Sequence, residues 1–292
     1  MGISVVILTL NEEKNLPGCL ESVRWCDDIV VFDSHSSDQT TQIADSWGAR
    51  VYQREFDNYA AQRNSALRIP TYKYPWVLML DADERVSSEL ADEIRKVSEN
   101  DDNGFTLYRI RRKDMFMGRW LRRSSGYPTW FGRLIRVGHV VVKREINEEY
   151  HTEGKVGHLE QHLIHYPFNK GVDYWFERHN RYSSMEAKTL ISELQSGPVI
   201  KWKDLFSNDP VVRRRVHKKI AYRMPFRLFW VFCYLYFFRL GILDGRAGLT
   251  YSVLRCIYEY MIDVKFRENY FHAKETKAIG ILPVPTQHPD EV

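Results

Sequence analysis

Cysteine is scarce in this chain of 292 residues, which has only four copies. They are widely separated and no two form a C-x-x-C pair, so the sequence excludes a disulfide framework and the common zinc and redox motifs. A reducing compartment is therefore expected. The first residues lack the basic segment of a secretory signal peptide, so we expect no such signal. The four cysteines are Cys19, Cys26, Cys233 and Cys256.

Glycine-rich phosphate-binding loops are also missing. Neither G-x-G-x-x-G nor G-x-x-x-x-G-K-[ST] occurs, which excludes the two commonest nucleotide-binding motifs. A nucleotide would have to be held by polar side chains at strand ends instead. The apolar run LFWVFCYLYFF at 228–238 has eleven residues, whereas a transmembrane helix needs about 20.

Acidic residues are unevenly distributed along the chain. Residues 1–100 contain 10 Lys and Arg against 17 Asp and Glu, the remainder contains 32 against 21, and residues 211–243 have no acidic residue. This asymmetry indicates two tasks, with the basic part facing an anionic surface. The content of 44% hydrophobic and 27% charged residues is that of an ordinary folded protein, although 14% aromatic is high.

Strand and helix patterns alternate through the first 80 residues. Short β-rich apolar runs predict strands, and amphipathic segments between them predict helices. The predicted strands cover residues 3–10, 28–32, 49–54 and 76–80, and the predicted helices cover 15–23, 39–47 and 60–67. This alternation predicts an α/β fold, with a Rossmann-like, mostly parallel sheet and helices on both faces.

The segment 76–85, WVLMLDADER, is the centre of the predicted domain. Its apolar run predicts a strand buried on both faces, and Asp81 and Asp83 follow at once. Ligands of such sheets bind at the carboxyl ends of the strands. Two carboxylates there suit Mg²⁺ or Mn²⁺ carrying a phosphate-bearing substrate. The alternative is that they only cap a helix beginning near Ser87.

Polar side chains also stand where the first two predicted strands end. Thr9, Asn11 and Glu12 lie at the end of the first strand, and Asp33 lies at the end of the second. They are candidates for holding a nucleotide. For each of them a role in a turn or a helix cap is the alternative.

Four segments in this order give the chain a family resemblance: VVILTLNEEKNL, IVVFDSHSSDQT, AAQRNSAL and WVLMLDADE. The chain resembles glycosyltransferase family 2, inverting enzymes with a GT-A fold that use a nucleotide sugar and a divalent metal. More narrowly it is similar to the lipopolysaccharide-core and glycan-assembly branch. That branch shares the W-x-x-R-L-x-R segment at 130–136 and the LDGRAG segment at 243–248. The resemblance covers nearly the whole chain and is looser beyond residue 100.

The resemblance implies a role for each matching residue. Thr9 and Glu12 would line the nucleotide site, and Asp33 would contact the base. Arg63 would approach the diphosphate. The implied roles at the end of the 76–80 strand are the ribose or metal for Asp81, and the metal for Asp83. A divalent ion bridging two phosphates neutralises the charge that develops as the diphosphate leaves.

Inversion needs a general base that takes the proton of the acceptor hydroxyl. Related sequences place a His-Glu pair after the 130–136 segment, and this chain has Asn147 in place of the histidine. Glu148 is then the candidate catalytic base, with Glu145 and Glu149 not excluded. A solvated turn is the alternative for all three.

Two further segments carry candidate groups. His158, His162 and His165 have helical spacing that could seat a second metal, although amphipathic packing is as natural and His165 could line the acceptor cleft. Residues 109–123 are basic with interleaved aromatics. No nucleic-acid motif supports nucleic acid as the partner, so we expect an anionic glycolipid or diphosphate there, or a solvated surface.

The later part of the chain is basic and aromatic. A helix is predicted over 173–194, and the run at 228–238 is too short to cross a bilayer but suited to lie in its interface. The stretch at 249–264 is predicted to be amphipathic. The alternative is a buried helical hairpin or an oligomer interface.

These observations combine into one prediction. Residues 1–170 form the nucleotide-sugar-binding catalytic domain, 171–278 a helical region that meets the membrane and the acceptor, and 279–292 a loose tail. The protein is then a metal-dependent hexosyl-type glycosyltransferase at the cytoplasmic face of the inner membrane, acting on a lipid-linked or lipopolysaccharide-type acceptor. The alternatives are a catalytically silent nucleotide-sugar-binding scaffold and a nucleotidyltransferase.

Overall fold

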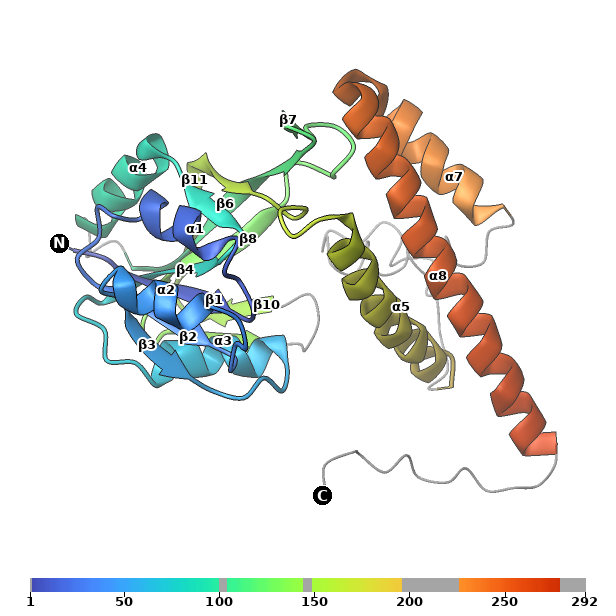
Figure 1. Cartoon of the computed structure of the whole chain (residues 1–292), viewed down its shortest axis with the longest axis horizontal. Coiled ribbons are helices and arrows are strands. Elements are labelled where there is room, and N and C mark those ends of the chain that lie inside the picture. The colour runs from blue at the N-terminus through green and yellow to red at the C-terminus, as the bar shows by residue number, and fades with distance from the viewer. Residues whose placement is uncertain (1, 100–103, 144–148, 196–225, 279–292) are drawn as a thin grey trace. The chain divides into compact units, whose positions relative to one another are not determined.

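The computed structural model describes residues 2–99, 104–143, 149–195 and 226–278 (Figure 1). The chain forms two compact units, Met1–Val172 and Asp173–Val292. The tail predicted at 279–292 and the candidate bases Glu145 and Glu148 lie outside the described residues.

The first part of unit 1 alternates strands and helices as predicted. The strands are β1 (Ser4–Thr9), β2 (Ile29–Asp33), β3 (Arg50–Gln53) and β4 (Trp76–Asp81), and the helices are α1 (Leu16–Ser22), α2 (Thr40–Ser46) and α3 (Tyr59–Arg68). Neighbouring strands in the order β3-β2-β1-β4 are all parallel. Their carboxyl ends therefore meet at one edge, where Thr9 pairs with Asp33 and Leu8 pairs with Asp81.

The second part of unit 1 extends this sheet with mixed pairing. Along the path, β4 is followed by β8, β6, β11 and β5, and the β4·β8, β6·β8 and β11·β5 pairs are antiparallel. The predicted mostly parallel α/β sheet is thus confirmed, with an antiparallel extension. The added elements are β5 (Glu84–Val86), α4 (Ser88–Glu99), β6 (Phe105–Phe116), β7 (Arg119–Trp120), β8 (Trp130–Arg136), β9 (Val140–Lys143), β10 (Glu149–Thr152) and β11 (Lys155–His165).

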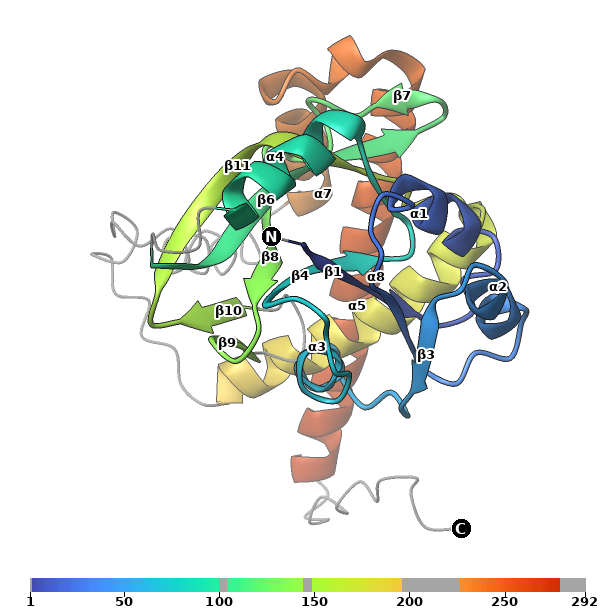
Figure 2. The ribbon, with the colours of Figure 1, turned by 90° about the vertical axis from the view of Figure 1, so that its left-hand side faces the viewer.

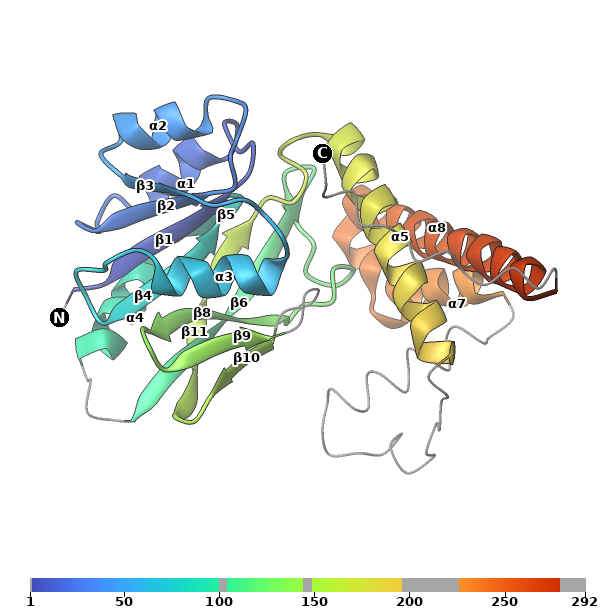
Figure 3. The ribbon, with the colours of Figure 1, turned by 90° about the horizontal axis from the view of Figure 1, so that it is seen from below.

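Helices cover both faces of the sheet (Figure 3). One apolar cluster packs α1, α2 and α4 against one face, and another packs α3 against the opposite face. The continuous apolar run of β4 is buried from Trp76 to Leu80 because both clusters contribute to its surroundings. The β9–β10 ribbon lies next to α3 (Figure 2), where Asn64 bonds both the backbone N–H and the carbonyl of Val142.

The prediction of helical spacing for His158, His162 and His165 is wrong, because all three lie on strand β11. The segment alternates between buried and exposed positions: Leu159 and Leu163 are buried and His158 is exposed. A register shift between His158 and His162 disturbs the pairing with β6. Side chains on a strand alternate between its two faces. In β11 this alternation leaves His165 buried, whereas His158 is exposed and His162 is half-buried.

Unit 2 is helical in its described residues. It contains most of α5 (Val172–Gln195), which confirms the predicted helix, and then α7 (Arg227–Cys233), the π-helical turn η3 (Tyr234–Phe238), the 3₁₀ turn η4 (Gly241–Asp244) and α8 (Gly245–Ala278). The LDGRAG segment forms the junction of η4 and α8. A Cβ atom at Gly248 would lie 2.1 Å from the carbonyl oxygen of Gly241, so only glycine fits there.

No single helix among the described residues has the length and apolarity to span a membrane. The segments Arg227–Phe238 and Gly241–Phe271 meet those criteria only when taken together, and the chain bends by 70° between them.

Candidate active site

The loops after β1 and β2 are bound to each other by the polar residues predicted at the strand ends. Asp33 is fully buried. Its carboxylate accepts hydrogen bonds from the Thr9 hydroxyl at 2.7 Å and from the Ser36 backbone N–H at 2.8 Å. Asn11 has a positive φ of 55° and accepts from the Ser37 backbone N–H at 2.8 Å. The contact of Asp33 with a base stays a prediction.

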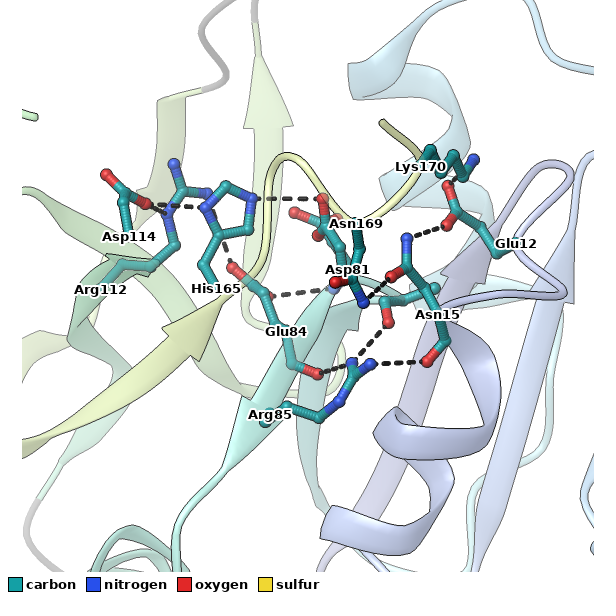
Figure 4. A network of polar contacts seen from close by, with 12 residues as sticks. Glu12, Asn15, Asp81, Glu84, Arg85, Arg112, Asp114, His165, Asn169 and Lys170 are labelled. Atoms are coloured by element: carbon teal, nitrogen blue, oxygen red, sulfur yellow. Dashed lines mark hydrogen bonds and ion pairs between the residues drawn. The ribbon is translucent and has the colours of Figure 1, made fainter. Parts of the chain in front are cut away.

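Glu12 meets a segment far away in the sequence (Figure 4). One carboxylate oxygen accepts from the Asn15 amide at 2.8 Å, and the other lies 2.5 Å from the ammonium of Lys170, just after β11. Asn169 also donates to Asn15 at 2.9 Å. Burial raises the pKa of Glu12, although Lys170 and Asn15 lower it in part.

Asp81 ends β4 between two arginines. One of its oxygens lies 2.8 Å from Arg63 Nη2, and the other lies 2.5 Å from Arg133 Nη2. Burial alone would raise the pKa of Asp81, but Arg133 and Arg63 outweigh it and hold that pKa well below its ordinary value. Arg63 is thus paired with a carboxylate at the end of β4. Its approach to a diphosphate stays a prediction.

Glu84 completes this buried cluster. Its side chain has no exposed surface, lies 2.8 Å from Arg133 Nη2 and accepts the Asp81 backbone N–H at 3.0 Å. Arg112 on β6 approaches the same carboxylate at 3.7 Å. Burial works against the charge of Arg133, but Asp81 and Glu84 raise its pKa above the ordinary value.

Asp83 has a different environment from Asp81. Its Oδ2 lies 3.2 Å from Nε2 of His165, whose Nδ1 lies 2.7 Å from Oδ1 of Asp114 on β6. Burial and Arg112 would lower the pKa of His165, yet the two carboxylates raise it overall. Asp83 Oδ1 is buried and has no hydrogen-bond partner among the described residues.

That orphaned oxygen fits a divalent cation. Mg²⁺ and Mn²⁺ prefer carboxylate oxygens, and Mg²⁺ sites commonly combine one or two carboxylates with substrate phosphates and water. Within the described ranges no three His, Cys, Asp or Glu side chains form a complete metal site. Both oxygens of Asp81 are already held by arginines. The geometry therefore favours Asp83 over Asp81 as a ligand, and the metal role of Asp81 stays a prediction.

Three contributors to the site were not assigned to it from the sequence. Arg133 was visible only as part of the W-x-x-R-L-x-R segment, and Asp114 and Lys170 carried no motif. Only the tertiary structure brings these three residues to the site, because each comes from a strand or loop that follows the DAD segment by 30 residues or more. Arg112, from the basic segment 109–123, lies in the cluster instead of on a solvated surface.

Comparison with known proteins agrees with this architecture. The family model described as glycosyl transferase family 2 matches residues 4–157. An uncharacterized glycosyltransferase of Rickettsia typhi is 27% identical over 91% of this chain and 87% of its own length. The lipopolysaccharide core biosynthesis glycosyltransferase LpsC of Rhizobium meliloti is 27% identical over 74% of this chain and 80% of its own.

The S. aureus TarS structure in complex with UDP is 17% identical, covering 97% of this chain and 93% of that one with a TM-score of 0.46. That likeness is too distant to add to the argument. The protein is by class a glycosyltransferase. The chain belongs to glycosyl transferase family 2, which confirms the resemblance drawn from the four ordered segments.

Replacing Arg133 tests the buried cluster. Arg133→Met would leave Asp81 and Glu84 short of a compensating charge, and removing one partner of a buried ion pair typically costs about 3–5 kcal/mol. We expect urea unfolding to show a loss of that order. Arg24→Met, which breaks an exposed pair with Glu21, is the matched control and should change stability little. Equal, small losses in both variants would contradict the structural role of Arg133.

Proposed function

We propose that this family-2 enzyme transfers a sugar, with inversion, from a nucleotide-diphosphate donor to a lipid-linked or lipopolysaccharide-type acceptor. One observation supports the binding of the nucleotide-sugar donor. Near the carboxyl end of β4, one buried hydrogen-bond acceptor and one buried hydrogen-bond donor lack partners among the described residues. Asp83 Oδ1 is a buried acceptor without a donor, and Arg133 Nε is a buried donor without an acceptor among the described residues. A metal-bound diphosphate supplies both partners.

The residues at this edge have separable tasks in the proposed reaction. Asp83 and His165 would hold Mg²⁺ or Mn²⁺, which neutralises the charge developing on the leaving diphosphate. Arg63 and Arg133 add fixed positive charge beside it, and Asp81 keeps both guanidinium groups in place. Charge held in advance in a buried site requires little reorganisation during the reaction.

Two features support the acceptor class. LpsC, a relative over 74% of this chain, is named for lipopolysaccharide core biosynthesis. The basic, aromatic composition of residues 211–243 suits an amphiphile with an anionic head group.

Removing the orphaned oxygen tests the donor site. Asp83→Ala is expected to abolish sugar transfer and the metal-dependent part of nucleotide binding, because the cation loses its carboxylate ligand. Calorimetric titration of nucleoside diphosphates with and without Mn²⁺ measures the binding, and Asp27→Ala, on an exposed carboxylate, is the control. Full activity in the Asp83 variant would refute the site. Release of pyrophosphate by the unaltered enzyme would indicate a nucleotidyltransferase instead.

The candidate base is tested separately. We expect Glu148→Gln to bind the donor normally and to lose turnover by ~10²–10⁴-fold, because only proton removal is affected. Glu145→Gln and Glu149→Gln serve as comparisons. Unchanged turnover in the Glu148 variant would move the assignment to whichever of these two is inactive.

We further propose that unit 2 binds the cytoplasmic surface of the inner membrane. The segment from the start of α7 to the start of α8 exposes a series of large apolar side chains, here called the aromatic face. Exposed patches of this kind mark interaction surfaces, and arginines at an interface pair with lipid phosphates. Arg239 lies among these residues and Arg246 is exposed just after them. The aromatic face consists of Phe226, Phe229, Trp230, Tyr234, Phe237, Phe238, Leu240, Ile242 and Leu243.

Vesicle sedimentation tests this surface. The protein should sediment with anionic vesicles and be released only in part by high salt, because apolar insertion does not depend on charge. Phe238→Ser should weaken binding by ~10-fold, the effect of removing one buried aromatic side chain. Phe271→Ser removes another strongly exposed phenylalanine further along α8 and should leave binding unchanged. Equal effects of the two changes, or complete release by salt, would contradict insertion of the aromatic face.

A further inference from the structure

Asp114 has no role in the family motifs, yet it is buried next to the proposed metal site. It lies near the end of β6 and pairs in register with His165 on the neighbouring strand β11. Its Oδ1 is 2.7 Å from His165 Nδ1, while the opposite ring nitrogen, Nε2, is 3.2 Å from Asp83 Oδ2. One imidazole therefore connects two carboxylates from different strands (Figure 4 shows Asp114 and His165).

The two nitrogens of the His165 imidazole can have different roles, one toward Asp114 and the other toward Asp83. A histidine that donates its Nδ1–H to a carboxylate can give up its Nε2 proton and bind a metal ion through the Nε2 lone pair. Metal-binding histidines are typically oriented by such a partner, and loss of that partner typically costs 10–100-fold in metal affinity. His165 is only 8% exposed, so neighbouring groups and not solvent determine the orientation of its ring.

We propose that Asp114 is a positioning residue, which holds His165 in the tautomer and orientation that direct Nε2 toward the cation beside Asp83. This inference rests on the proposed metal-dependent function. It assigns Asp114 no contact with substrate or metal. Its effect passes through His165 alone.

A purely structural role for Asp114 is the competing explanation. Arg112 Nε lies 3.1 Å from the same Asp114 oxygen and also approaches Glu84. Asp114 could then serve only to balance the charge of Arg112. The two roles differ in one respect: the positioning role requires His165, and the structural role does not.

A double-mutant cycle separates these roles, with the Mn²⁺ affinity of the full-length protein measured by electron paramagnetic resonance, with and without a nucleoside diphosphate. Asp114→Ala should weaken Mn²⁺ binding by ~10-fold or more. Asp114→Asn, which keeps an acceptor oxygen but loses the charge, should weaken it less. In a His165→Ala background neither change should have a further effect. Asp92→Asn, on an exposed carboxylate paired with Arg95, is the control.

Each outcome is decisive. An Asp114 effect that persists in the His165→Ala background would assign Asp114 to Arg112 and overturn the proposal, and so would unchanged affinity in Asp114→Ala. Unchanged Mn²⁺ affinity in His165→Ala overturns it as well. If the proposed metal-dependent function itself is wrong, Asp83→Ala will instead show normal metal-dependent nucleotide binding.

A second readout covers the case in which Asp114→Ala does not fold. Nitrogen-15 NMR of the imidazole reports which ring nitrogen carries the proton. We expect His165 of the unaltered protein to be protonated at Nδ1 in the presence of a diamagnetic divalent ion, Mg²⁺, and Asp114→Asn to shift the tautomer population. An identical spectrum for Asp114→Asn would refute the positioning role.

Discussion

Compensation of buried charge at the carboxyl end of β4 is the constraint on which the site depends. Asp81, Asp83 and Glu84 follow one another within four residues and are largely removed from water. An isolated buried carboxylate would be protonated and not charged. Arg63 and Arg133 keep Asp81 ionised, and the mixed extension of the sheet supplies Arg133 from β8. The antiparallel strands are therefore part of the site as well as of the scaffold.

Asp81 and Asp83, the two aspartates of the DAD segment, are compensated unequally, and this difference is the basis of the separate roles proposed for them. Asp81 has a guanidinium on each oxygen, whereas Asp83 has a histidine on one and no described partner on the other. A cation approaching the site therefore meets Asp83 without displacing an arginine. Asp81 instead fixes the guanidinium groups of Arg63 and Arg133, which in the proposed reaction supply positive charge beside the departing diphosphate.

Local patterns in the sequence were enough for the first half of the sheet, since β1, β2 and β4 are each a short apolar run that leads into polar residues. Those patterns also located Thr9, Asp33, Asp81 and Asp83 at one edge. They could not reveal the partners of these groups. Asp114 and His165 meet through strand pairing between segments 51 residues apart, and β11 is a strand with a register shift between His158 and His162 although its histidine spacing is typical of a helix. Long-range pairing and local irregularity leave no periodic signal.

Unit 2 raises the question of why folded helices keep so many aromatic side chains exposed to water. Arg227 on α7 and Arg255 on α8 both pair with the buried Glu259. This ion cluster links α7 to α8, while Phe226, Phe229, Phe237 and Phe238 remain exposed. Full burial of such a side chain is worth about 1.5–3 kcal/mol relative to leaving it exposed, which supports the membrane-binding role proposed for the aromatic face. Because the helices that carry the aromatic face are already folded, the insertion proposed above would cost little conformational entropy.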